Sequence, residues 1–287
     1  MNAVFHHELS SWRTNVVAYV FVAFLLLFGG IYTMVMCLKG GYANYEYVFY
    51  NMTFVYIITV PILTMRVISE ERRQKTDQLL YSLPISMTKV ALGKYFAMLV
   101  VLAIPVAILC VYPLVLRAFG NVYLPEAFST ALAFFLLGAT LLAIGMFISS
   151  VTESQPAAAG LSFVVMLLLY FLTSLAEYIP TSAGASMVAY MITWLVLCLI
   201  IWAMTKNLFI SAVLFIVGEV ALLICANLFM SSFYNSFPTI LAAISPFDRF
   251  YTFVTGVFDL TGIVYYITVI ALFLYLSIQS LEKRRWS

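Results

Sequence analysis

Apolar runs about twenty residues long follow one another along almost the whole chain, and they constrain its fold more than any other feature. A helix needs roughly 20 mostly apolar residues to cross a bilayer, and it satisfies the backbone polar groups of its own segment in lipid. Only 9% of the 287 residues are charged, against about 25% in soluble domains. The sequence therefore predicts an all-α polytopic membrane protein, a single transmembrane domain over residues 1–287 with no separate soluble domain.

Eight runs have the length of a span, so we predict about eight transmembrane helices. The turn at Lys206-Asn207 separates the sixth run from the seventh. The alternative has six spans and a re-entrant hairpin over residues 187–230. The predicted spans are residues 16–36, 51–68, 94–117, 127–150, 156–178, 187–205, 208–230 and 261–281.

Two segments outside these runs are predicted to lie along the membrane surface. In residues 1–15, the apolar side chains of Val4, Leu9 and Trp12 are spaced to share one helical face, and charged side chains are available to the other. This pattern is typical of an interfacial helix. Residues 231–260 are rich in Phe and Tyr and also contain Pro, Asp and Arg. They are too polar to span, and we expect an outer interfacial segment.

The longest polar interruption follows the second run and reads SEERRQKTDQLLYSLPISMTKVALGKY, from Ser69 to Tyr95. Ser69 predicts a helix N-cap with two glutamates in the first turn, and Pro84 predicts the end of that helix. Its leucines share one face and its charges the other, a two-sided arrangement suited to docking on a partner. The residues of this segment that we expect to meet a partner are Glu70, Glu71, Arg72, Arg73, Thr76, Asp77, Leu79, Leu80, Leu83 and Pro84.

The distribution of Lys and Arg predicts the orientation of the chain. With eight spans and both termini in the cytoplasm, eleven of the fourteen basic residues face the cytoplasm. Only Lys39, Arg117 and Arg249 then face outward, and the inverted arrangement would reverse the ratio. We therefore predict a multi-pass protein of the plasma membrane with both termini in the cytoplasm.

Motifs for catalysis, nucleotides and metals are absent from the sequence. The one Gly-Lys pair, Gly93-Lys94, is followed by Tyr95 and does not form a P-loop. The four cysteines have neither metal-ligand nor redox spacing, and the two histidines are adjacent in the interfacial segment. We expect no catalytic residues, no metal, no cofactor bound by this chain and no nucleic acid partner. The chain is predicted not to be an enzyme.

Glu219 is a carboxylate near the middle of the seventh run, in FIVGEVALLICAN. An intramembrane charge costs from about 2.5 to well over 10 kcal/mol, depending on the reference state, so it needs compensation. One hypothesis is a cation or proton site, or a polar group on a substrate route. The other is a protonated or hydrogen-bonded glutamate that joins two helices. Asn227, two turns further along the same run, would take part in that contact.

The polar stretch resembles the ABC-2 class of ATP-binding-cassette permeases, on four motifs that follow the second span. These are Glu70-Glu71-Arg72, Thr76-Asp77-Gln78-Leu79-Leu80, Pro84-Ile85-Ser86 and Gly93-Lys94-Tyr95. The segments SSVTESQPAAA and SPFDRFYTFVTGVFDLTGIVYY continue the match, which resembles the gliding-motility-associated branch. Lys75 stands where many relatives carry Gly, and residues 187–230 look like an added hairpin relative to six-span members.

The resemblance implies that residues 69–92 hold the cytoplasmic coupling helix that docks on a separate ABC ATPase subunit, which binds ATP and Mg. It also implies a second permease copy, identical or different, and an extracytoplasmic accessory protein as further partners in the bilayer. The expected function is the permease subunit of an ATP-driven exporter. Two alternatives stay open: an ion- or proton-coupled secondary transporter that uses Glu219, and a non-transporting membrane anchor that relays ATPase motion to extracytoplasmic partners.

Overall fold

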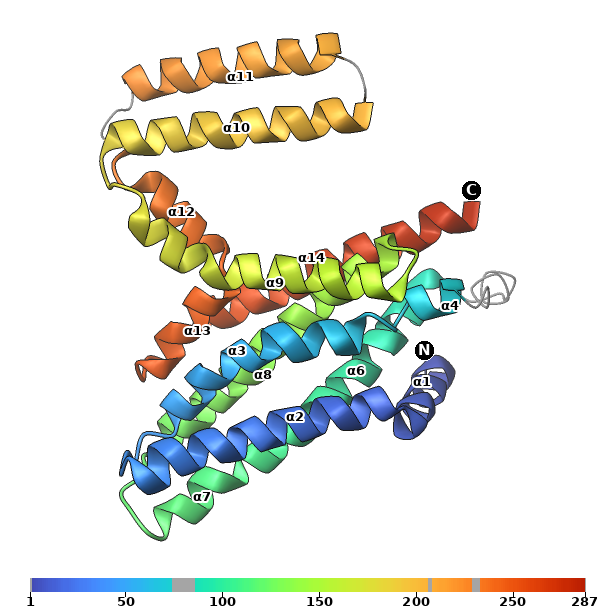
Figure 1. Cartoon of the computed structure of the whole chain (residues 1–287), viewed down its shortest axis with the longest axis vertical. Coiled ribbons are helices and arrows are strands. Elements are labelled where there is room, and N and C mark those ends of the chain that lie inside the picture. Colours follow the sequence, from blue (N-terminus) through green and yellow to red (C-terminus); the bar gives the residue numbers. More distant parts are fainter. Residues whose placement is uncertain (1, 74–85, 206–207, 229–232, 287) are drawn as a thin grey trace. The chain divides into compact units, whose positions relative to one another are not determined.

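The computed structural model describes residues 2–73, 86–205, 208–228 and 233–286, and every regular element in these ranges is a helix (Figure 1). The predicted all-α membrane fold is thereby confirmed. Six helical stretches within the described ranges are long and apolar enough to cross a membrane. They are Val16–Lys39, Glu46–Arg73, Met87–Arg117, Leu124–Val151, Gln155–Tyr178 and Leu260–Arg284.

The described apolar stretches 183–199 and 211–225 are shorter than a full span. The count of eight therefore stays a prediction. Two helices begin before the predicted spans that they contain: the second spanning helix begins at Glu46, before residue 51, and the third begins at Met87, before residue 94.

The chain divides into two compact units, and the larger one comprises residues 1–170 and 249–287. This unit 1 contains the amino-terminal helices, the carboxy-terminal helix, the first part of α9 and the last part of α13. The elements that contribute to it are α1 (Asn2–Thr14), α2 (Val16–Tyr32), the π-helical η1 (Thr33–Lys39), α3 (Glu46–Thr64), α4 (Ser69–Arg73), α6 (Met87–Leu109), α7 (Val111–Arg117), α8 (Leu124–Val151), α9 (Gln155–Tyr178), α13 (Pro246–Val254) and α14 (Leu260–Trp286).

Helix α8 lies at the centre of unit 1, where it packs against α3, α6 and α14. Small residues on α8 let α3 approach closely, as is common between membrane helices. A Cβ atom added to Gly145 would lie 2.8 Å from Cβ of Thr64. The Thr64 hydroxyl donates a hydrogen bond to the Val60 carbonyl at 3.0 Å, so Thr64 is not free to yield. The glycine is therefore required for this contact.

Aromatic side chains fill the same core. The ring of Tyr56 stacks on Phe134 at 4.3 Å between centroids, and Phe49 packs on Phe134 at 5.2 Å. The buried phenol of Tyr56 donates to the Phe134 carbonyl at 3.3 Å, and that of Tyr95 donates to the Ala139 carbonyl at 3.0 Å. These polar groups are thus satisfied inside an apolar core, as burial demands.

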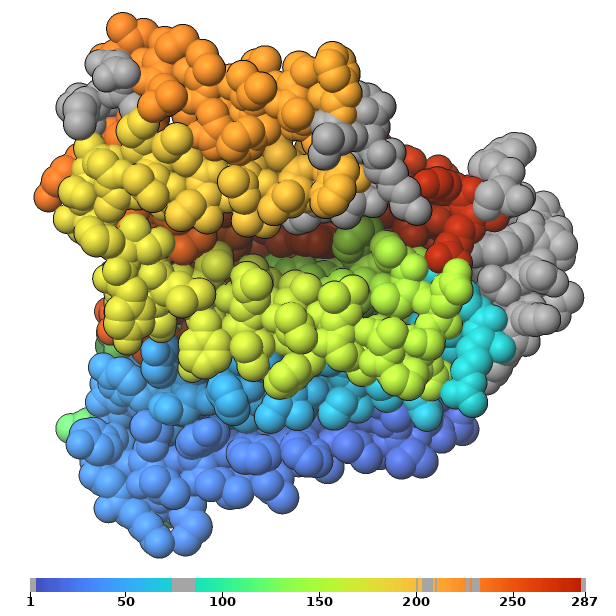
Figure 2. All heavy atoms as spheres, turned by 45° about the horizontal axis from the view of Figure 1, so that its top comes forward, coloured from blue at the N-terminus to red at the C-terminus, as the bar shows by residue number. Residues whose placement is uncertain are grey.

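The exposed surface of the α2–η1 span is apolar. In the space-filling view, α2 and α3 adjoin in one layer of side chains, drawn in blue (Figure 2). Only 22% of the α2–η1 span is buried inside the structure, and Leu27 and Ile31 are among its exposed side chains. Such a large apolar surface suits contact with lipid or with another membrane protein.

Unit 2 comprises residues 171–248 and is built around a hairpin of α10 (Ala183–Thr205) and α11 (Leu208–Leu228). The indole of Trp194 lies directly over Gly218 of α11, where any side chain would collide with it. Its Nε1–H donates to the Leu214 carbonyl at 3.3 Å. A third helix, α12 (Ser236–Ile244), packs on α10 (Figure 1).

Candidate functional site at the charged end of unit 1

The docking segment predicted from the sequence begins at α4, and α4 is a continuation of α3. A turn over residues 65–68 joins the two helices. The predicted N-cap role of Ser69 was wrong: its hydroxyl donates back to the Met65 carbonyl, because the helical path has no free start at this point. The backbone N–H groups of Ile68 and Ser69 donate to Oγ of Ser149 on α8, at 3.3 and 3.2 Å. This side chain fixes the turn against α8.

A buried lysine joins α4 to two other helices. The ammonium group of Lys94, on α6, lies 2.6 Å from a carboxylate oxygen of Glu71 and 2.8 Å from one of Glu8, on α1. Its side chain is only 3% exposed. A buried charge is tolerated when it is paired and hydrogen-bonded, and here two carboxylates supply the partners. We call Glu8, Glu71 and Lys94 the lysine triad.

Close packing of α1 on α6 holds Glu8 of the lysine triad near Lys94. A Cβ atom added to Gly93 would lie 2.9 Å from Cγ1 of Val4, so the glycine lets α1 lie directly on α6. Trp12, at the far end of the same helix, is 7% exposed. The helix expected over residues 1–15 is thus present as α1, and part of its apolar face packs on protein. Its position at a membrane surface stays a prediction.

A second anchor of α4 is the carboxy-terminal end of α8. The guanidinium group of Arg72 donates to the Thr152 carbonyl at 2.8 Å and to the Ser150 carbonyl. From α14, Ser280 donates to the Ser150 carbonyl at 3.1 Å, and Arg284 donates to the Val151 carbonyl at 3.2 Å. The last carbonyls of a helix have no intrahelical donors and form the negative end of its dipole, which explains the two arginines. The end of α8 therefore ties α4 to α14.

The remaining charges of this end are more exposed and contribute less. Arg66 lies 4.0 Å from Glu70, and both side chains are about a third exposed. The Arg66 guanidinium also donates to Oδ1 of Asn15 at 3.4 Å, and the same oxygen accepts the N–H of Val17 and caps α2. Exposed pairs of this kind contribute at most about 1 kcal/mol to stability.

Four of the ten residues predicted to meet a partner lie in α4. The structure places Glu71 in the lysine triad, Arg72 at the end of α8, Glu70 beside Arg66, and Arg73 on the exposed surface. The other six lie outside the described residues, so their apolar strip stays a prediction. They are Thr76, Asp77, Leu79, Leu80, Leu83 and Pro84.

Sequence reasoning did not find the partners of these residues. Glu8, Ser149 and Arg284 lie far from α4 in the sequence, and no local pattern connects them with it. Lys94 gave a signal, because it stands in the apolar helix Met87–Leu109. A charge in such a helix predicts a buried partner but does not identify it.

The second predicted polar site lies in unit 2. Glu219 is half-buried on α11, and its Oε2 atom is buried without a hydrogen-bond partner. Asn227 is also on α11, but its side chain lies outside the described residues, so their pairing stays a prediction. Across the described part of the chain, no group of three His, Cys, Asp or Glu side chains could hold a metal ion.

No curated protein matches the chain. The comparison with protein families agrees with this architecture. A family model described as ABC-2 family transporter protein matches residues 38–206, more than half of the 287 residues. The match contains Glu71, Arg72 and Lys94. With its six apolar spanning helices and this family match, the chain is a multi-pass membrane protein that belongs to the ABC-2 transporter family.

Proposed function

We propose that this chain is the permease subunit of an ATP-driven exporter, and that residues 69–92 couple it to a separate ATPase subunit. Membership of the ABC-2 family supports a permease component of an ABC transporter. The observation that carries the coupling role is the lysine triad. It connects the start of the docking segment, at Glu71, with two other helices through the buried Lys94.

The two anchors of α4 explain how motion of the docking segment would reach the membrane helices. Separating a buried ion pair leaves an uncompensated charge, which costs about 3–5 kcal/mol. A pull on α4 therefore displaces α6 and α1 with it before the triad opens. The Arg72 bonds carry the same pull to α8 and, through the shared carbonyl of Ser150, to α14.

The ATP and Mg of this mechanism belong to the ATPase subunit, and this chain supplies no catalytic residue. The family generally works with such a subunit, and a second permease copy, identical or different, completes the translocation path. The gliding-motility-associated branch and an extracytoplasmic accessory protein remain part of the proposal, supported by the sequence motifs around residues 246–266.

Reconstitution with an ABC ATPase subunit from the same organism tests the proposal. We expect the two proteins to copurify, and hydrolysis by the ATPase to rise when the permease is present in phosphatidylcholine nanodiscs. An unrelated ABC ATPase is the matched control and should show neither effect. A permease that neither binds nor stimulates any ABC ATPase subunit of its own organism would contradict the proposed function.

We also propose that α10 and α11 make two full spans, with both termini in the cytoplasm. The positive-inside distribution of Lys and Arg supports this arrangement. In a chain whose four cysteines are replaced by alanine, a cysteine at Asn207 should react with a membrane-impermeant maleimide only after permeabilisation. A cysteine at Lys39, which is exposed and expected outside, should react in intact cells. Labelling of position 207 in intact cells would refute the eight-span arrangement.

The two alternatives predict different outcomes in vesicles. A secondary transporter that uses Glu219 needs no ATP, because an ion or proton gradient drives the movement of its substrate. A membrane anchor stimulates hydrolysis but moves no substrate. Uptake into inverted vesicles, measured with ATP, with a proton gradient and with neither, separates the three.

A further inference from the structure

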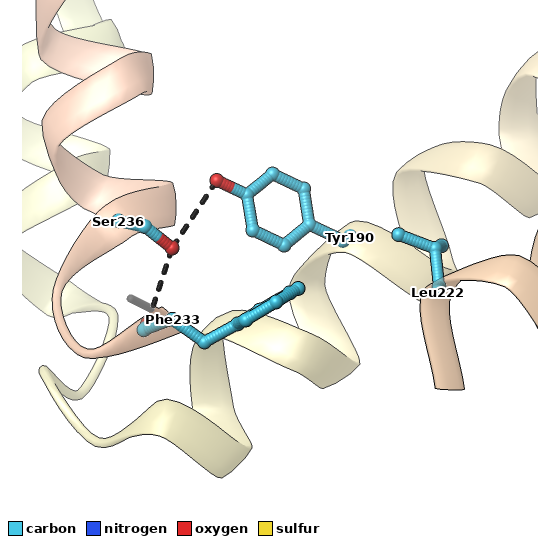
Figure 3. A pocket seen from close by; sticks show the side chains of 4 residues that line it. All are labelled: Tyr190, Leu222, Phe233 and Ser236. Carbon is cyan, nitrogen blue, oxygen red and sulfur yellow. Dashed lines mark hydrogen bonds between the residues drawn. The ribbon is translucent and has the colours of Figure 1, made fainter. Parts of the chain in front are cut away.

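Unit 2 contains a pocket of about 220 Å³ that the coupling role does not use, lined by Tyr190, Leu222, Phe233 and Ser236 (Figure 3). Three segments build it, because Tyr190 comes from α10, Leu222 from α11, and Phe233 and Ser236 from the start of α12 and the turn before it. A cavity of about 150 Å³ already holds benzene. The pocket therefore has room for one ring or a short alkyl segment.

Two of the four residues that line the pocket are aromatic. The ring of Phe233 meets that of Tyr190 at 5.8 Å and 88°. The ring of Phe237 also contacts Tyr190, at 4.9 Å between centroids and 86°. Edge-on contacts of this kind hold rings in fixed orientations. The faces that remain open attract apolar groups and cations, since an aromatic face carries negative charge density.

The hydrogen bonds of the pocket use both of its side-chain hydroxyl donors. Ser236 donates its hydroxyl hydrogen to the Phe233 carbonyl at 3.1 Å, and Tyr190 donates its own to Oγ of Ser236 at 3.3 Å (Figure 3). The phenol oxygen of Tyr190 keeps its lone pairs as acceptors. Nearby on the hairpin, the N–H of Trp194 is bound to the Leu214 carbonyl. What is left for a ligand at Tyr190 is an acceptor.

A carboxylate with one unpartnered oxygen lies one helical turn away. Glu219 precedes Leu222 by three residues, so both lie on the same face of α11. Its Oε2 atom is buried and has no hydrogen-bond partner. A buried polar atom without a partner calls for an explanation, and a missing donor is the simplest one. Aromatic faces, a phenol acceptor and this carboxylate together favour a ligand that is apolar and positively charged.

We propose that unit 2 binds small amphipathic amines, with the apolar part against Tyr190, Leu222 and Phe233 and the ammonium group toward Glu219. We infer that these amines are also the molecules exported, and this part of the proposal rests on the proposed function. Binding itself needs no ATPase, so the failure of either proposal is distinguishable from the failure of the other.

The test compares 2-phenylethylammonium with 2-phenylethanol, which has the same ring and chain length but no charge. The full chain is placed in phosphatidylcholine nanodiscs, binding is measured by calorimetry, and empty nanodiscs provide the baseline. We expect the cation to bind at least tenfold more tightly than the alcohol. Equal affinities for the unmodified protein would overturn the proposal without any variant.

Two substitutions assign the preference to the pocket. Glu219→Gln should reduce the affinity for the cation to that for the alcohol, and Tyr190→Ala should weaken both ligands at least tenfold. The matched control is Glu177→Gln, which removes an exposed carboxylate of the same unit and should leave the preference intact. If Glu177→Gln lowers the preference as much as Glu219→Gln does, the attraction is a surface charge effect and the site is refuted. The proposed site would also be refuted if only long-chain lipids displaced the bound cation.

Discussion

Leu79→Asp combined with Leu80→Asp is expected to abolish capture of the ATPase subunit and stimulation of its hydrolysis, while the chain still inserts into the membrane. The two leucines lie on the apolar strip of the predicted coupling helix. Burying two leucines in a partner contributes about 3–5 kcal/mol, which corresponds to a factor of more than about 100 in affinity. An exposed charge such as Arg73 contributes under about 1 kcal/mol and should mainly orient the complex.

The control places the same two charges elsewhere on unit 1. Phe119→Asp with Asn121→Asp changes two exposed residues between α7 and α8, and it should leave ATPase capture unchanged. Membrane yield is measured by immunoblot, and the amount of ATPase captured in a pull-down is divided by that yield. If yield falls for the leucine variant while capture per molecule persists, the strip packs within the protein or on the bilayer, and the coupling assignment is withdrawn.

Lys94→Met should have the largest effect on stability, lowering the free energy of unfolding by about 3–5 kcal/mol. The reason is that Glu8 and Glu71 would face each other across a nearly buried site without the charge that now lies within 2.8 Å of both. Unfolding in increasing mole fractions of sodium dodecyl sulfate, followed by circular dichroism, measures the loss.

A neutral triad separates the lost charge from the lost side chain. Glu8→Gln, Glu71→Gln and Lys94→Met together remove all three charges and keep the approximate shape, so most of the stability should return. Lys89→Met, at an exposed position of the same helix, should change the free energy of unfolding by less than about 0.5 kcal/mol. Equal losses for Lys89→Met and Lys94→Met would show that the triad does not stabilise the protein.

The sequence alone determined the class of the protein and the approximate course of its helices. The run predicted at residues 127–150 is the helix Leu124–Val151, and the run at 156–178 is Gln155–Tyr178. Such agreement is possible because the length of an apolar run is a local property, and in a membrane the helix is the structure that satisfies its backbone within one segment. The absence of a P-loop is equally local, and so are the motifs that resemble the ABC-2 class.

Only the tertiary structure decided what the polar residues do. Glu8 and Lys94 are 86 residues apart, and the packing of α1 on α6 brings them together. Ser69 has the sequence of a helix cap, yet its hydroxyl and its N–H are used by Met65 and Ser149, because α4 continues the path of α3. Arg72 looks like a surface charge in the sequence but lies at the carbonyl end of α8. The partner of each polar group depends on how the helices pack against one another. No single segment of the sequence contains this information.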